Sequence, residues 1–168
     1  MKATQYLVMA VCGTALAGQV FAAGGGFCTA DEKAYFSCHT GKKVVSVCGS
    51  KDLTDHSGYL QYRFGASPVK PDLVYPADRQ HPRAHFRLAT DHTAKASAEA
   101  LSFTNGDFDY TVYAERSATD GYSYGVLVQK KGQRVAQLSC MGTPNADALS
   151  ELTGRGIPEQ SPDDIAWP

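Results

Sequence analysis

The chain has few of the features that membranes or nucleic acids would require. Its longest apolar run is well short of the roughly 20 residues that a helix needs to span a bilayer. Lysine and arginine total 16 against 17 acidic residues, and they form no basic run or stripe. Nucleic acids and anionic membranes attract basic patches, so neither is an expected partner. The chain also lacks an Asn-x-Ser/Thr glycosylation acceptor, which favours a bacterial over a eukaryotic exported protein.

The first 22 residues have the pattern of a secretory signal peptide. Lys2 precedes an apolar run over residues 6–17, and small residues end the segment at Ala22. We expect cleavage near Ala22, export to the periplasm and a single disulfide-stapled β domain over residues 23–168. Cys12 lies inside the signal segment, so cleavage would reduce the five cysteines to four.

Four cysteines in an oxidising compartment are typical of a two-disulfide framework, and they allow three connectivities. If the first hairpin turns near Gly41, Cys48 lies about four residues beyond the partner of Cys38, or roughly 13 Å away. The Cα atoms of a disulfide lie within about 7 Å, so this pair is disfavoured. A Cys28 to Cys38 bridge would need the short segment between them to double back. We therefore expect Cys28 with Cys48 and Cys38 with Cys140.

Apolar residues alternate at period two and are interrupted by Gly-containing turns, which is typical of antiparallel strands. Asn105-Gly106 fits a two-residue type I′ turn within a hairpin over residues 98–113, which places Phe103 opposite Phe108. The apolar face of this hairpin then contains Leu101, Phe103, Phe108 and Tyr110.

A second hairpin is predicted over residues 124–140 around Lys131-Gly132, with Val128 opposite Val135. Further strands are predicted over residues 35–48, 58–65 and 85–90. The pattern indicates an all-β fold, an antiparallel meander of six or seven strands that closes into a small barrel or sandwich.

The last part of the chain changes character. Thr143-Pro144 predicts the start of a short C-terminal helix over residues 146–153. An extended tail follows from about residue 157, with Ile165 and Trp167 as the groups able to dock it. Four prolines predict a long loop over residues 66–83.

Catalytic and metal-binding patterns are weak. His81 and His85 have helical i, i+4 spacing, but Pro82 and the strand that follows disfavour a helix; Asp91 and His92 could add ligands. The residues around Asp107 and Asp109 do not include the Asp-rich loop and the bidentate Glu that a calcium-binding loop requires. Asp55-His56-Ser57 places three catalytic residue types side by side, whereas a triad is assembled from distant segments. We expect no metal, no cofactor and no catalytic site.

A protein-contact surface is the better supported expectation. The predicted strand over residues 58–65 places Leu60, Tyr62 and Phe64 on one face and directs Tyr59, Gln61 and Arg63 outwards. Tyrosine and arginine are enriched at interface hot spots. The polar segment 50–58 just before this strand is the preferred contact loop. The alternative is that these tyrosines are ordinary strand residues covered by the tail.

Several segments carry resemblances to known proteins. The chain resembles an uncharacterised family of small exported proteobacterial proteins in residues 36–43, 58–65, 103–106, 125–128 and 138–140. Tyr35-Phe-Ser-Cys38 with Gly41 is also similar to the opening strand of periplasmic inhibitors of C-type lysozyme. Those inhibitors are small disulfide-bonded β-barrels that insert a Ser-Gly-x-x-Tyr loop into the enzyme's cleft. Ser57-Gly58 followed by Tyr62 resembles that loop, with one residue more between Gly and Tyr.

The sequence therefore predicts a periplasmic protein-binding module, an inhibitor or immunity protein that occludes an envelope-degrading enzyme. The expected partner is another protein, such as a lysozyme-like or other periplasm-acting enzyme. The predicted contact residues are Ser57, Tyr59, Gln61, Tyr62 and Arg63. The alternatives are a hydrolase of cell-envelope polymer that uses acids such as Asp107 and Asp109, or a structural envelope protein without a catalytic site.

Overall fold

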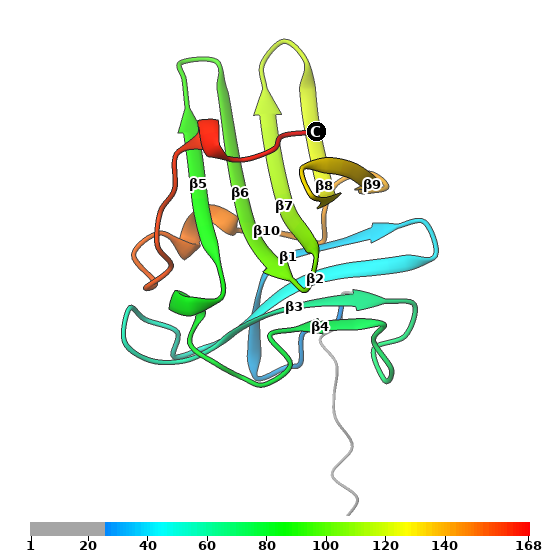
Figure 1. The fold of residues 1–168 in the computed structure, drawn as a ribbon, viewed down its shortest axis with the longest axis vertical. Coiled ribbons are helices and arrows are strands. Elements are labelled where there is room, and N and C mark those ends of the chain that lie inside the picture. Colours follow the sequence, from blue (N-terminus) through cyan, green and yellow to red (C-terminus); the bar gives the residue numbers. More distant parts are fainter. Residues whose placement is uncertain (1–25) are drawn as a thin grey trace, which may run out of the picture.

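A computed structural model describes residues 26–168, and the expected signal peptide lies outside this range. The described chain forms two antiparallel five-stranded sheets that pack against each other (Figure 1). The first sheet contains, in spatial order, β10 (Ala146–Asp147), β1 (Glu32–Thr40), β2 (Lys43–Ser50), β3 (Leu60–Gly65) and β4 (Leu73–Tyr75). The second contains β5 (Arg87–His92), β6 (Ala96–Asn105), β7 (Phe108–Ser117), β8 (Gly121–Lys130) and β9 (Gln133–Ser139). The predicted all-β sandwich is confirmed.

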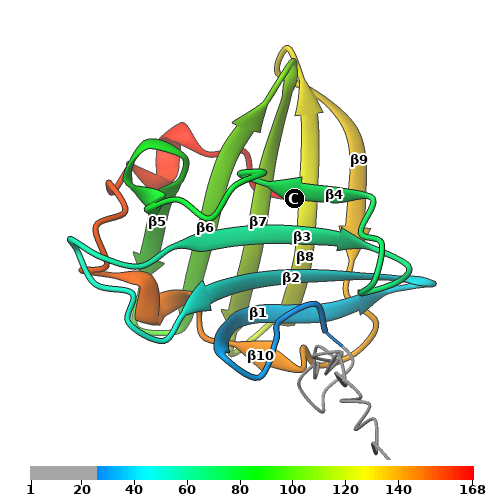
Figure 2. The same cartoon turned by 90° about the horizontal axis from the view of Figure 1, so that it is seen from below.

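The strands of the two sheets cross, as Figure 2 shows. Each sheet contributes one apolar face to the core between them, and Phe103 of β6 lies within it. The Phe103 ring is stacked on Tyr75 at 4.5 Å and on Tyr110 at 4.8 Å between centroids, and its centroid is 5.0 Å from that of Tyr62. Aromatic pairs of this kind contribute about 0.5 to 1.5 kcal/mol each beyond their buried area. Strands β3, β4, β6 and β7 are thus joined through side chains.

The hairpin of β6 and β7 has the predicted faces but a different turn. Asn105 pairs with Phe108, so the turn residues are Gly106 and Asp107, and Phe103 pairs with Tyr110. Gly106 has a φ of +61°, and no positive φ is found at Asp107, which is the pattern of a type II′ turn. The register differs from the prediction by two residues. A shift of two leaves every side chain on its expected face.

The hairpin of β8 and β9 has the predicted turn and an unpredicted bulge. Lys131 and Gly132 both have positive φ, at 52° and 75°, as a type I′ turn requires. A register shift next to Gln129 places Val128 opposite Ala136 instead of Val135. The extra residue of a bulge is left unpaired, and Val135 is accordingly 53% exposed.

Both predicted disulfides are confirmed. Cys28 is bonded to Cys48 and Cys38 to Cys140, with sequence separations of 20 and 102 residues. Cys140 directly follows β9, so the second bond joins the end of the second sheet to β1 in the first. Disulfides are typical of proteins in oxidising compartments.

An arginine also connects the sheets. Arg116 on β7 pairs with Glu99 on β6 and, at 2.6 Å, with Asp147 on β10. Glu99 is 3% exposed, so its charge is compensated inside the protein rather than by water.

Two sequence predictions for irregular segments need correction. The predicted helix over residues 146–153 is replaced by β10 and a single 3-10 turn, Leu149–Leu152, because Asn145 and Ala148 donate backbone hydrogen bonds to β1. The predicted loop 66–83 contains the short strand β4 and the start of a second 3-10 turn, Pro82–Ala84. The strand predicted over residues 85–90 runs over Arg87–His92.

The tail docks as predicted. Leu88 on β5 donates a backbone hydrogen bond to Pro158 and accepts one from Gln160, so the tail lies along the edge of the second sheet. Ile165 and Trp167 pack against Ala89 and Ala100. A third 3-10 turn, Pro162–Asp164, lies within the tail. Across residues 26–168 no helix is long and apolar enough to cross a membrane.

The two disulfides should contribute unequally to stability. In chain-entropy terms, a closed loop of 20 residues stabilises by about 3 kcal/mol and one of 102 residues by about 5 kcal/mol. We expect the double variant Cys38→Ser/Cys140→Ser to lose more unfolding free energy in urea than Cys28→Ser/Cys48→Ser. Mass spectrometry of the oxidised protein should show no free thiol among these four cysteines. Four alkylatable thiols would contradict the framework.

Candidate functional site

The predicted contact residues on β3 alternate as expected, but they are not exposed. Tyr62 faces the core and is 1% exposed. Gln61 and Arg63 do lie on the opposite face of β3, yet they are 4% and 9% exposed. The prediction that these two side chains face solvent is therefore wrong, and none of the three is free to contact a partner directly.

The burial of Gln61 and Arg63 has a physical cause in distant segments. The chain before β1 crosses this face of the first sheet and is held there by the disulfide between Cys28 and Cys48. The Phe27 carbonyl accepts a hydrogen bond from Arg63 Nη1 at 2.9 Å. The segment after β4 covers Gln61, whose Nε2 donates to the Pro76 carbonyl at 2.9 Å. The outer face of this sheet is thus a second, largely polar interior.

A buried ion pair lies at the centre of this polar interior. Glu32 at the start of β1 has a side chain with 0% exposure and receives both Arg63 terminal nitrogens, at 2.7 Å and 2.6 Å. The Thr29 amide and the Tyr59 hydroxyl also donate to the Glu32 carboxylate, each at 2.8 Å. Arg63 donates in addition to Gln61 Oε1 at 2.7 Å. Such complete pairing is what a buried charge needs in order to be tolerated.

The environment shifts two pKa values in opposite directions. Burial alone would raise the pKa of Glu32, but the hydrogen bonds from Arg63, Thr29 and Tyr59 and the charge of Arg63 outweigh it and lower the pKa to about 2. Burial and the hydrogen bond to Glu32 raise the pKa of Tyr59 to about 12. At neutral pH Glu32 is therefore charged and Tyr59 is a neutral donor.

Tyr59 connects this buried network to the surface. Tyr59 is half-buried, and the Arg79 guanidinium lies over its ring, 4.9 Å from the ring centroid. The Arg79 side chain is 58% exposed and reaches Glu32 at 3.8 Å. Of the predicted contact residues on this strand, Tyr59 is the one beside an accessible surface.

The loop over residues 51–58 is exposed at its tip and ordered internally. The Thr54 side chain accepts hydrogen bonds from the amides of His56 and Ser57, at 3.2 Å and 3.1 Å. Ser57 Oγ donates to the Asp52 carbonyl at 2.9 Å. Leu53 is 0% exposed and anchors the loop in the core.

Other segments hold the loop from outside. Arg83 donates to the Asp55 carbonyl at 2.9 Å, Arg155 donates to the Leu53 carbonyl at 2.5 Å, and His81 Nε2 lies 3.2 Å from the Thr54 carbonyl. Figures 1 and 2 show the loop, the Pro82–Ala84 turn and the chain after Leu152 at the same end of the molecule. The loop backbone is therefore fixed by two segments distant in sequence.

Two glycines allow this packing. Gly58 has a φ of +84°, and a Cβ there would lie 2.5 Å from Ser50 Oγ and 2.6 Å from Leu53 Cα. Gly156 has a φ of +73°, and its Cβ would lie 2.7 Å from the Asp55 carbonyl oxygen. Side chains rarely adopt these φ values, so both positions require glycine.

The candidate site is the exposed part of loop 51–58 together with the adjoining Tyr59 and Arg79 pair. Six of the eight loop residues are exposed, and their side chains mix both charge signs with hydroxyls. These exposed residues are Lys51, Asp52, Thr54, Asp55, His56 and Ser57. His56 is paired with Asp55 at 3.0 Å, while the Ser57 hydroxyl is directed to backbone, so the three do not form a proton relay.

The other chemical candidates lie elsewhere. His81 accepts from the Arg83 amide, and His85 bonds Gln80 at 2.8 Å. Asp107 is in the β6–β7 turn, 3.5 Å from Lys130, and Asp109 accepts from Thr104 at 2.7 Å. In the described part of the chain, no three His, Cys, Asp or Glu side chains are grouped as metal ligands.

Several important residues of the site were not identified from sequence. Glu32, Arg79, Arg83 and Arg155 each make at least one contact with a group 27 or more residues away in the sequence. Local periodicity carries no signal for such pairs. From the sequence, Gly58 and Gly156 could be identified only as turn residues, not as positions where the loop packs closely.

No protein-family model matches the chain, and no curated protein or solved structure is significantly similar to it. The function of the site must therefore be inferred from its own geometry.

Replacing Arg63 should destabilise the protein strongly. Arg63→Ala leaves the Glu32 carboxylate buried without its partner, which typically costs about 3 to 5 kcal/mol. Arg79→Ala is the matched control, because Arg79 is exposed and should cost less than about 1 kcal/mol. Urea denaturation measures both. Equal, small losses for the two variants would show that the ion pair is dispensable.

The stability should depend on acid pH through Glu32. Because its folded-state pKa is about 2 and its ordinary value is 4.5, the Glu32 contribution is fully present above pH 4.5 and is lost as the pH falls through 2. The loss should be on the order of 3 kcal/mol. Unfolding free energies at about pH 6 and about pH 2 should therefore differ less in Glu32→Gln than in the natural chain. An identical difference in both proteins would rule out this assignment.

Proposed function

We propose that the protein is a periplasmic protein-binding module that occludes the cleft of an envelope-degrading enzyme, as an inhibitor or an immunity protein. Loop 51–58 is the inserting element, and Tyr59 with Arg79 forms its flank. The observation that carries the proposal is the contrast within this loop: its side chains are exposed while its backbone is fixed by Leu53, Arg83 and Arg155.

A fixed and exposed loop favours binding on energetic grounds. Association costs free energy for every loop and side chain that becomes ordered at the interface. A loop already held by a buried leucine and by bonds to its carbonyls loses little further freedom when it enters a cleft.

The chemistry of the loop suits a polar cleft. Lys51, Asp52 and Asp55 provide charges of both signs, and His56 and Ser57 provide hydrogen-bonding groups. Arg79 stacked on Tyr59 adds the two residue types most enriched in interface hot spots. Enzymes that cleave sugar polymers have clefts lined with carboxylates and other polar groups, which could accept such a loop.

Two observations of different kinds support the proposed compartment. The two disulfides are typical of an exported protein. The pattern of residues 1–22 is that of a signal peptide. Both support a location in the periplasm, where envelope-degrading enzymes act.

The proposal is tested by inhibition assays with a panel of purified envelope-degrading enzymes, including a C-type lysozyme. We expect the oxidised domain to bind one of them stoichiometrically and to abolish its activity. The variant Asp55→Ala/His56→Ala should weaken this inhibition at least about tenfold, as expected when two central contacts of an interface are lost. The melting temperature should change little, because both side chains are exposed.

A second Asp-His pair offers a matched control. Asp91 and His92 at the end of β5 are also exposed, so Asp91→Ala/His92→Ala makes the same chemical change elsewhere. This control should inhibit normally. Gly156→Ala should also weaken inhibition although it removes no loop side chain, because its Cβ would displace the Asp55 backbone. Absence of inhibition across the panel, with turnover of peptidoglycan by the domain itself, would favour the hydrolase.

A further inference from the structure

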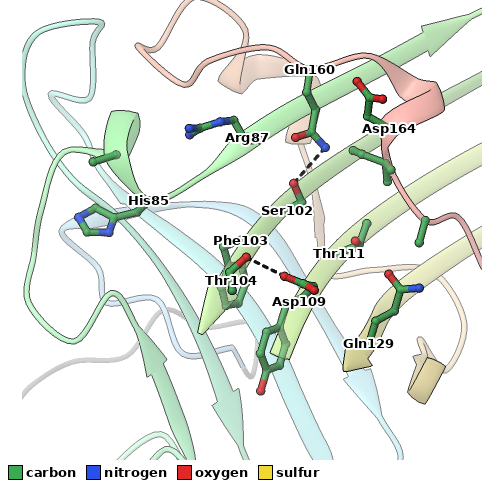
Figure 3. A pocket seen from close by; sticks show the side chains of 14 residues that line it. His85, Arg87, Ser102, Phe103, Thr104, Asp109, Thr111, Gln129, Gln160 and Asp164 are labelled. Atoms are coloured by element: carbon green, nitrogen blue, oxygen red, sulfur yellow. Dashed lines mark hydrogen bonds between the residues drawn. The ribbon is translucent and has the colours of Figure 1, made fainter. Parts of the chain in front are cut away.

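A polar pocket lies on the outer face of the second sheet, away from loop 51–58 (Figure 3). It has a volume of about 420 Å³, which is within the usual range for small-molecule sites. The residues on its floor come from four adjacent strands. They are Arg87 on β5, Ser102 and Thr104 on β6, Asp109 and Thr111 on β7, and Gln129 on β8.

The alternation of the strands explains why this floor is polar. Leu101, Phe103 and Val112 face the core, so their neighbours Ser102, Thr104 and Thr111 face outwards. Much of the remaining outer face is covered by the tail. The floor of the pocket is one part of this face that the tail leaves open.

The tail forms the wall of the pocket and is itself well held. Gln160 is bonded by its backbone to Leu88 and by its side chain to Ser102 at 3.3 Å. Asp164 and Ile165 also line the pocket, and Ile165 is 8% exposed. The pocket is thus preformed by a docked segment, and its shape does not depend on a free end of the chain.

One hydroxyl in the pocket has no protein partner. Thr111 is only 6% exposed, it lies on the pocket floor, and its side chain makes no hydrogen bond to the rest of residues 26–168. The Thr111 oxygen is not fully shielded from the pocket, so water or a ligand there can supply its hydrogen bond. Arg87 Nη1 donates hydrogen bonds to the carbonyls of Phe86 and Arg83. The other two guanidinium nitrogens make no hydrogen bond within the described chain.

The charges of the pocket narrow the class of ligand. Arg87 supplies a positive charge, but Asp109 and Asp164 supply two negative ones, so an anion would meet two carboxylates. An apolar ligand would remove these charges from water without compensation. A molecule with many neutral hydroxyls can both donate and accept at each position, which matches a floor of hydroxyl, amide, carboxylate and guanidinium groups.

We propose that this pocket binds a neutral saccharide. The ligand would lie along the floor between Arg87 and Gln129 and hydrogen-bond the Thr111 hydroxyl, with the Gln160 to Asp164 segment at its side. This binding does not depend on the protein partner of loop 51–58, because the two surfaces share no side chain.

The test is an NMR titration of the oxidised protein with three defined probes: maltotriose, cellotriose and N,N′,N″-triacetylchitotriose. We expect saturable shifts of the Ser102, Thr111 and Gln129 amides with at least one probe, at a dissociation constant of roughly 1 mM. Thr111→Val removes the hydroxyl while keeping the shape, and should weaken binding roughly three- to tenfold, the value of one hydrogen bond.

Matched variants separate the site from general effects. Gln129→Ala should also weaken binding, whereas Gln133→Ala at the start of β9 and the exposed Thr143→Val should not. Unchanged binding in both Thr111→Val and Gln129→Ala would overturn the site. So would the absence of saturable shifts with all three probes, or tighter binding of inorganic phosphate than of any saccharide at the same amides.

Discussion

The buried ion pair between Glu32 and Arg63 is the constraint on which the candidate site depends. Both charges are removed from water, so each needs a nearly complete set of partners. Those partners come from the segment before β1, from β3 and, through Gln61, from the segment after β4. The pair is satisfied only when these segments are all in place. It therefore couples the covering of the first sheet to the position of Tyr59, which directly follows the contact loop.

The two sheets use their outer faces differently. The outer face of the first sheet is sealed by the disulfide between Cys28 and Cys48 and by the ion pair, and loop 51–58 extends from its end. The outer face of the second sheet is covered in part by the docked tail, and the pocket that contains Thr111 is a region that the tail leaves open. The core between the sheets holds the aromatic stack around Phe103 and offers no access to a partner. The two proposed binding surfaces are accordingly a loop and part of an outer sheet face, both supported by a packed interior.

Much of this fold follows from local sequence patterns. The period-two alternation, the glycine turns and the cysteine spacing predicted the longer strands, their core-facing residues and both disulfides. The hairpin register of β6 and β7 differed by two residues, because Gly106 occupies the first and not the second turn position. The predicted helix over residues 146–153 failed because the edge of β1 offered backbone partners to this segment. In this segment, backbone hydrogen bonds to β1 outweigh the intrinsic preference of the residues for a helix.

The site was less predictable, since its contacts join residues far apart in sequence. Gln61 and Arg63 have the pattern of an exposed strand face, and only the covering segments make them buried. The central claim is that loop 51–58 is rigid in the free protein because this network and its anchors hold it. ¹⁵N relaxation of the free domain tests this most directly. Order parameters for residues 51–58 should lie near those of the strands, about 0.85, whereas values below about 0.6 would show that the loop is not held in place.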